Sequence, residues 1–262
     1  MGKIKLYNGD CLEVMKTLPE HSVDMILCDL PYGSTACKWD IIIPFDKLWE
    51  HYKRIIKDKG IICLFGNEPF ASHLRLSNLK WYRYDWCWDK GTHSNPLLAK
   101  KQPLRIYENI CVFYKSSGTY NPQMEQGKPY KKDYGYDKHS TETLGKIVLI
   151  DSDNLTGLRY PRNIIKFGQN KNNRKFSHPT QKPVALLEYL IKTYTNEGDL
   201  VLDNTMGSGS TGVACVKTNR AFIGIELEKK YYDIAHNRIR ETIDKAGKNQ
   251  YNKTENENGK SK

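Results

Sequence analysis

Three short apolar runs that end in acidic residues constrain the fold of this chain more than any other feature. They cover residues 23–28, 200–203 and 221–225, and the acids at their ends are Asp29, Asp203 and Glu226. Runs of this length and composition are typical of strands buried on both faces of a parallel sheet. Ligands of open α/β sheets bind at the carboxyl ends of such strands. The runs therefore predict an α/β fold with a ligand site beside these acids.

The first of these strand ends reads Asp29-Leu30-Pro31-Tyr32-Gly33. Because Leu30 precedes a proline, its backbone is biased to an extended form that fixes the direction of its carbonyl. The stretch then offers a carboxylate, an aimed carbonyl and a flat ring, which suit a planar amino group. Pro-Tyr-Gly is also common turn chemistry, so this stretch alone does not separate a site from an ordinary turn.

A glycine-rich loop follows the second strand end, at residues 204–212. Its glycines, Gly207 and Gly209 among them, allow a ligand to approach backbone N–H groups at the start of a helix. Glu226 lies near the spacing of an acid that binds ribose hydroxyls, so the loop by itself also fits a nicotinamide enzyme. Two observations count against that alternative. The loop lies in the last quarter of the chain, which leaves too little chain after it for a full dinucleotide domain, and the long segment before it has its own site-like strand end at Asp29.

A third segment, residues 178–183, reads His-Pro-Thr-Gln-Lys-Pro and opens a predicted helix. In this order, the Asp-x-Pro-Tyr stretch, this hexapeptide and the Asp-x-x-x-Gly-x-Gly loop resemble the DNA amino-methyltransferases of the β arrangement, which use S-adenosylmethionine. The resemblance implies one Rossmann-like domain with a mostly parallel seven-stranded sheet, a circularly permuted motif order and an inserted target-recognition region. It is strong over the first and last thirds of the chain and weak in the middle.

The resemblance also implies roles for individual residues. The catalytic stretch is Asp29, Leu30, Pro31 and Tyr32. The cofactor residues are Asp10, Cys11, Asp29, His178, Thr180, Gln181, Lys182, Asp203, Thr205, Gly207, Gly209, Ser210, Thr211 and Glu226. Asp10 has a second expected job as the cap of a helix that begins at Cys11. His178 has no cysteine or histidine at metal spacing, so no metal site is expected.

The chemistry expected of this family is transfer to an exocyclic nitrogen. Acceptors on both N–H groups of the amine, here Asp29 and the Leu30 carbonyl, favour release of its lone pair for direct in-line attack. Tyr32 is expected to stack on the base, which must be flipped out of a duplex to reach the site. An Asp in the first position resembles adenine-N6 enzymes, whereas cytosine-N4 enzymes more often have Ser. Leu30 departs from the family, where proline is more usual.

Several alternatives stay open at this level. Methylation of cytosine N4, of an RNA base or of a glutamine amide uses the same kind of site. A nucleic-acid-binding protein without activity is a further alternative. Cytosine-C5 chemistry is disfavoured, because it requires a thiolate that usually follows a proline and none of the seven cysteines does.

Composition divides the chain into four parts. We expect a catalytic part at residues 1–114, a target-recognition insertion at 115–175, a cofactor-binding part at 176–244 and a disordered tail at 245–262. The insertion interleaves basic and aromatic residues, which suits phosphates and bases, with an insertion that contacts nothing as the less favoured alternative. A basic loop from Lys90 to Arg105 is predicted near the substrate, with a merely solvated loop as the alternative.

The net charge of +11 and the pI near 9.1 predict an anionic partner, here double-stranded DNA. No apolar run reaches the length of about 20 residues that a membrane span needs. The scattered cysteines are typical of reduced thiols, so a cytoplasmic protein is expected. The family resemblance implies that a bacterium or a phage encodes it. Many members of the family form dimers, which makes a homodimer an open alternative, although no stretch marks an interface.

Overall fold

The computed structural model describes residues 2–34, 40–131, 153–168 and 181–258, with side chains up to residue 247. The chain forms two compact units. The main unit comprises Met1–Asn121 and Asn163–Lys262, and the second unit is Pro122–Arg162. All of the elements that position the site belong to the main unit.

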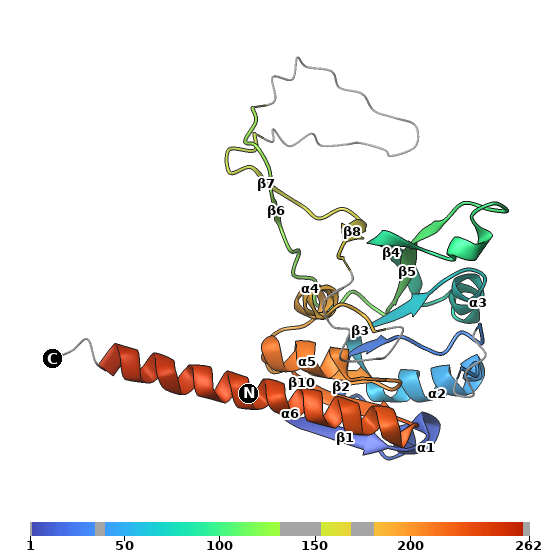
Figure 1. The fold of residues 1–262 in the computed structure, drawn as a ribbon, viewed down its shortest axis with the longest axis horizontal. Helices are drawn as coiled ribbons and strands as arrows, with labels where there is room; N and C mark the ends of the chain where they lie inside the picture. The colour runs from blue at the N-terminus through green and yellow to red at the C-terminus, as the bar shows by residue number, and fades with distance from the viewer. Residues whose placement is uncertain (1, 35–39, 132–152, 169–180, 259–262) are drawn as a thin grey trace. The chain divides into compact units, whose positions relative to one another are not determined.

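An eight-stranded sheet forms the centre of the main unit (Figure 1). Its strands, in spatial order, are β1 (Ile4–Asn8), β10 (Ala221–Glu226), β9 (Leu200–Asp203), β2 (Val23–Cys28), β3 (Ile56–Gly66), β5 (Arg105–Phe113), β4 (Tyr82–Ser94) and β8 (Ile164–Lys166). The first five strands are parallel to one another, and β5 runs antiparallel to both of its neighbours. The predicted mostly parallel α/β fold is therefore confirmed.

The sheet has one strand more than the seven that were predicted. The extra strand, β8, is three residues long and pairs parallel to the outer edge of β4. Only its middle residue, Ile165, is buried, so its sequence carries too few apolar positions to predict a strand.

Helices cover both faces of the sheet (Figure 1). One core lies between the sheet and α4 (Val184–Tyr194), α5 (Ser210–Lys217) and α6 (Lys229–Asn258). The other lies between the sheet and α1 (Cys11–Lys16), α2 (Phe45–Ile55) and α3 (Phe70–Ser77). A short 3₁₀ turn, η1 (Pro96–Leu98), lies between β4 and β5. The two helix layers cover the faces of the sheet, so a ligand site can form at the carboxyl ends of the parallel strands.

The backbone of residues 245–258 differs from the prediction of a disordered tail, because it continues α6 to Asn258. The segment contains no proline that would interrupt a helix. Because helical hydrogen bonds join residues four apart, α6 can continue past its packed part without further contacts to the sheet. The packed part of α6 ends near Ile239 and Ile243.

The second unit has a two-stranded antiparallel sheet of β6 (Glu125–Gln126) and β7 (Leu158–Arg159). A bridge joins Tyr130 to Asn154, and the Arg159 guanidinium lies 5.8 Å from the centre of the Tyr130 ring. The unit falls inside the predicted insertion at 115–175 and is shorter than it, because residues 115–121 and 163–168 belong to the main unit. No helix among the described residues is long and apolar enough to cross a membrane.

Candidate active site

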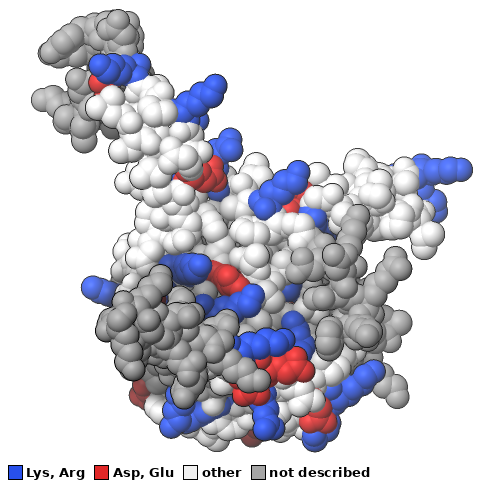
Figure 2. All heavy atoms as spheres, turned by 60° about the vertical axis from the view of Figure 1, so that its left-hand side comes forward, with Lys and Arg blue, Asp and Glu red and all other residues white. Residues whose placement is uncertain are grey.

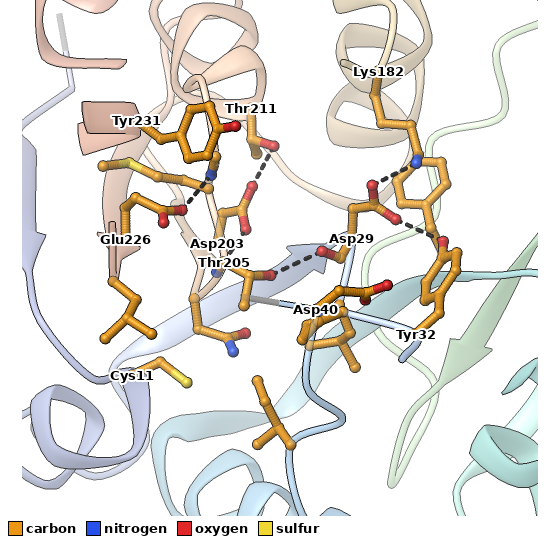
Figure 3. A pocket seen from close by; sticks show the side chains of 18 of the residues that line it. Cys11, Asp29, Tyr32, Asp40, Lys182, Asp203, Thr205, Thr211, Glu226 and Tyr231 are labelled. Atoms are coloured by element: carbon orange, nitrogen blue, oxygen red, sulfur yellow. Dashed lines mark hydrogen bonds and ion pairs between the residues drawn. The ribbon is translucent and has the colours of Figure 1, made fainter. Parts of the chain in front are cut away.

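A cavity of about 690 Å³ opens at the carboxyl ends of the parallel strands. Residues that follow β1, β2, β9 and β10 all line it, as the runs of apolar sequence predict. Of the predicted site residues, the cavity is lined by Asp10, Cys11, Asp29, Leu30, Pro31, Tyr32, Gln181, Lys182, Asp203, Thr205, Gly207, Ser210, Thr211 and Glu226. Stretches that lie far apart in the sequence thus meet in one chamber (Figure 3).

Asp29 is held on both sides of its carboxylate (Figure 3). The Tyr32 hydroxyl donates a hydrogen bond of 2.6 Å to Oδ1, and the Lys182 ammonium donates one of 2.5 Å to Oδ2. The Thr205 hydroxyl donates to the Asp29 carbonyl at 3.0 Å and so ties the end of β2 to the end of β9. Each carboxylate oxygen can accept about two hydrogen bonds, so the carboxylate keeps acceptor capacity for a further N–H group.

Lys182 belongs to a buried chain of alternating charges. Its ammonium also lies 3.2 Å from the Glu108 carboxylate, which in turn pairs with Lys90 at 3.1 Å. Burial disfavours the charged form of Glu108, but the two ammonium groups outweigh this effect and lower its pKa. Burial likewise opposes the charge of Lys182, yet the Asp29 and Glu108 carboxylates raise its pKa. All four groups are therefore compensated within the site.

The turn after β2 is fixed by its own hydrogen bonds and by stacking. Asp40 accepts from the backbone N–H groups of Gly33 and Ser34, both at 2.9 Å. Gly33 has a φ of 66°, a left-handed value that favours glycine. The Tyr32 ring stacks on Phe70 with centres 4.8 Å apart. Burial and the Asp29 charge raise the pKa of the Tyr32 phenol well above its usual value, so it remains a donor.

Asp203 at the other end of the cavity is buried and is held only by neutral donors. Its carboxylate accepts from the Thr211 hydroxyl at 2.6 Å and from the Thr205 backbone N–H at 3.1 Å. Burial raises its pKa to about 7, against the lowering effect of these two bonds. Within the described parts of the chain, Asp203 has no ion-pair partner. A cationic group of a ligand would compensate it.

Glu226 is held in the same way. Its oxygens accept from the backbone N–H groups of Gly207 and Glu228, both at 2.9 Å, and burial raises its pKa. Gly207 has a φ of 51°, which favours glycine at this turn. The carboxylate is thereby fixed at the rim of the cavity with acceptor capacity left for hydroxyl groups.

Asn204 supplies an unsatisfied donor beside these acids. Its Oδ1 accepts from the Tyr52 hydroxyl at 2.6 Å and from the Cys28 thiol at 2.8 Å, whereas its buried Nδ2 has no hydrogen-bond partner. Buried amide groups without partners are rare, and a polar ligand in the cavity would satisfy this one. Burial raises the pKa of the neighbouring Cys11 thiol to about 11, so it enters the site as a neutral group.

Some predicted residues differ from their expected roles. Gly209 does not line the cavity, because it caps α5 with a φ of 78° and packs where a Cβ would meet Ala235. Lys182, predicted as a cofactor residue, forms an ion pair with Asp29. Asp10, in contrast, caps α1 as expected by accepting from the Leu12 and Glu13 backbone N–H groups, and it also lines the cavity. His178 and Thr180 lie outside the described residues.

Several residues of the cavity were not predicted from the sequence. They are Asp40, Glu108, Asn204 and Tyr231, and Lys90 was assigned only to a basic loop. Glu108 had a usable signal, because it lies in a largely apolar stretch, residues 106–113, and a glutamate rarely becomes buried unless it is paired. The others lie in turns or at strand ends, where spacing alone does not show which way a side chain points.

The family model described as DNA methylase matches residues 23–237 of this chain. The chain belongs to this family of N6/N4 DNA methylases. This chain is 26% identical to the type II methyltransferase M.HpaI of Haemophilus parainfluenzae. The match covers 90% of this chain and 74% of M.HpaI. The type II methyltransferase M.HinfI of Haemophilus influenzae is 27% identical over 90% and 68%, respectively.

Solved structures agree with this assignment. The methylase resembles the crystal structure of an M1.HpyAVI–SAM complex with a TM-score of 0.62 and 25% identity, over 90% of its chain and 98% of that structure. The fold is also shared with the cytosine-N4-specific PvuII DNA methyltransferase, with a TM-score of 0.67, 15% identity and coverage of 91% and 86%. The protein is therefore an S-adenosylmethionine-dependent DNA amino-methyltransferase with a Rossmann-like fold.

The cavity fits this cofactor. An amino acid ammonium would compensate the buried Asp203, ribose hydroxyls would suit the fixed carboxylate of Glu226, and the Asn204 amide offers a free donor. A volume of about 690 Å³ also lies within the usual range of roughly 300–1,000 Å³ for ligand sites.

Proposed function

We propose that this methylase modifies adenine N6 in double-stranded DNA at specific sites. The observation that carries the proposal is the Asp29 carboxylate, held by Tyr32 and Lys182 at the end of β2 and facing a cavity that also contains Asp203 and Glu226. An aspartate at this position resembles the adenine-N6 members of the family.

The chain's own residues prepare the amino group for reaction. The lone pair of an adenine amino group is delocalised into the ring, so two acceptors on its N–H groups favour the pyramidal, nucleophilic form. Asp29 offers one acceptor and the Leu30 carbonyl the other, while Pro31 limits the backbone and Tyr32 presents its ring to the base. Preorganised groups of this kind are each worth roughly 100- to 1,000-fold in rate. Asp29 then holds the proton that leaves the amine as transfer completes.

The opposite end of the cavity would hold the cofactor. Asp203 would pair with its ammonium, Glu226 with its ribose hydroxyls, and Thr205, Gly207, Ser210 and Thr211 would line its path, with Asp10 and Cys11 near the same end. When bound, S-adenosylmethionine supplies an electrophilic methyl group on a positively charged sulfur, which the amino nitrogen takes in line. Gln181 lines the same cavity, and His178 and Thr180 remain proposed cofactor contacts.

A base within a duplex cannot enter such a cavity, so the target adenine would be flipped out. We assign target recognition to the insertion at 115–175, because it carries Lys, Arg and Tyr without the apolar pattern of a core. The described cysteines are free thiols, in keeping with a cytoplasmic enzyme. A homodimer is compatible with these assignments.

The test is incubation with isotopically labelled S-adenosylmethionine and unmethylated duplex DNA, followed by nucleoside mass spectrometry. We expect label in N6-methyldeoxyadenosine, and sequencing of the product would then give the recognition site. Label in N4-methyldeoxycytidine would keep the mechanism and overturn the base. Cofactor binding without transfer to DNA, but with transfer to RNA, would overturn the substrate.

A further inference from the structure

The hairpin of β4 and β5 extends outward from the sheet (Figure 1). Trp88, Lys90 and Ser94 of β4 and Glu108 of β5 line the cavity, and Ser94 still pairs with Arg105. Residues 95–104, which follow Ser94 without a break, therefore start at the cavity wall and project from it.

The tip of this hairpin is built by its own hydrogen bonds. Asn95 takes a left-handed φ of 61°, and its Oδ1 accepts from the Arg105 backbone N–H at 3.1 Å. The turn η1 follows, with the Leu98 N–H donating to the Asn95 carbonyl at 3.0 Å. This arrangement holds Leu97 outward with 95% of its surface exposed. A fixed apolar side chain in water is costly unless it meets a partner.

The charge around Leu97 indicates an anionic partner. The sequence from Lys90 to Tyr107 contains no acidic residue, whereas Lys100 and Lys101 are exposed beside the tip. In Figure 2 this hairpin stands out from the surface and carries basic side chains at its outer end. Apolar neighbours extend the exposed face, namely Leu98, Leu104 and Ile106. An exposed leucine flanked by lysines is complementary to duplex DNA, in which apolar stacked bases lie between two anionic phosphate backbones.

We propose that the β4–β5 hairpin is a wedge, with Leu97 entering the duplex beside the extruded base and Lys100 and Lys101 contacting the phosphates. The inference rests on the proposed function, because it requires a flipped base in the cavity. Apolar side chains between base steps are a general means of unstacking DNA. Three residues span at most about 10 Å, and the left-handed Asn95 and the turn η1 shorten this distance, so Leu97 lies within roughly three base-pair steps of about 3.4 Å from Ser94. Leu97 thus lies within reach of the gap that a base in the cavity leaves.

The test compares Leu97→Ser with the wild type on two duplexes that carry one site mapped with the wild-type enzyme. One duplex is intact, and the other has an abasic nucleotide opposite the target adenine, which weakens the pairing of that base. We expect single-turnover methylation of the intact duplex to fall roughly tenfold, and that of the abasic duplex to change less than twofold, because the wedge acts on unstacking. Leu79→Ser is the matched control, since Leu79 is also exposed but precedes the opposite end of β4.

A second readout does not depend on methyl transfer. With 2-aminopurine in place of the target adenine, wild-type enzyme should raise the fluorescence on binding, and Leu97→Ser should bind with little of that rise. Lys100→Ala with Lys101→Ala should weaken binding to both duplexes equally and reduce its salt dependence.

Each outcome separates the wedge from the proposed function. If the wild type methylates DNA and Leu97→Ser matches it within twofold on the intact duplex, the wedge is wrong and the function stands. An equal loss on both duplexes, or a changed oligomeric state of the DNA-free protein, would assign Leu97 to another contact. Absence of any DNA methylation by the wild type would overturn both proposals.

Discussion

The two ends of the cavity treat buried acids in opposite ways. At the catalytic end, Asp29 and Glu108 are paired with Lys182 and Lys90, so that charges alternate and cancel. At the cofactor end, Asp203 and Glu226 are held by backbone N–H groups and a hydroxyl, and burial raises their pKa values. The first end is complete without a ligand, whereas the second is stabilised by a cation that a ligand brings. Changes at the two ends should therefore have different consequences.

The largest effect is expected from Asp29→Asn, which keeps the shape of the side chain but removes its charge. The amide loses one acceptor and leaves Lys182 with a single carboxylate partner, so methyl transfer in single-turnover experiments should fall roughly 100- to 1,000-fold. Cofactor affinity should change little, because Asp203 and Glu226 are untouched. A rate within tenfold of the wild type would show that Asp29 is not the acceptor.

Lys182→Met should come next, because it leaves two carboxylates facing each other in the site. Removing one partner of a buried ion pair costs about 3–5 kcal/mol of the free energy of unfolding, which chemical denaturation would measure. The double variant Lys182→Met with Glu108→Gln restores the charge balance and should recover part of that loss. If the single and double variants were equally unstable, the charge chain would not be the source of the stability.

A smaller effect is expected from pH at the cofactor end. With a pKa of about 7, Asp203 is mostly protonated at pH 6 and mostly ionised at pH 8, so an ammonium ligand should bind roughly tenfold more tightly at pH 8. Calorimetry with S-adenosylhomocysteine would measure this change. Asp203→Asn should bind weakly at both values, without the pH dependence. A flat profile for the wild type would place the ammonium elsewhere.

The same group affects the stability of the ligand-free protein. Its folded pKa lies above the unfolded value, so its favourable contribution is complete below about pH 4 and is lost as pH rises to about 7. Thermal unfolding of Asp203→Asn between pH 5 and pH 8 should therefore depend less on pH than that of the wild type. An unchanged dependence would assign the loss to another group.

The smallest effect is expected from Tyr32→Phe, which removes a hydrogen bond of 2.6 Å to Asp29 but keeps the ring on Phe70. Lys182 still orients the other oxygen, so the transfer rate should fall about threefold to tenfold. Tyr32→Ala removes the ring as well and should cost more. Equal losses in the two variants would show that the ring contributes nothing beyond its hydroxyl.

The sequence predicted the parts of this architecture that depend on local pattern. Apolar runs located β2, β9 and β10 and placed Asp29, Asp203 and Glu226 at one edge of the sheet. The family resemblance added the cofactor and the reaction. Helix α1 begins where Asp10 can cap it, because capping involves only neighbouring residues.

The parts that were missed depend on contacts between distant residues. Lys182 was predicted only as a cofactor residue, yet its ammonium reaches Asp29, which lies more than half the chain away. Lys182 and Lys90 both form ion pairs with the Glu108 carboxylate. No regular spacing in the sequence connects these three residues. The role of Gly209 was misjudged for a similar reason, because α6 fills the space beside it.

The order of the strands also affects how the methylase is made. Strands β9 and β10 lie between β1 and β2, so β1 has no native neighbour, and β2 has only β3, until residues 200–226 exist. At roughly 5–20 residues per second on the ribosome, that delay lasts about 10–40 seconds. During this time the edges of β1 and β2 are open templates for wrong pairing. Strands β9 and β10 therefore complete the sheet when they insert between β1 and β2. Their acids, Asp203 and Glu226, are the last acidic residues of the cavity to be synthesised.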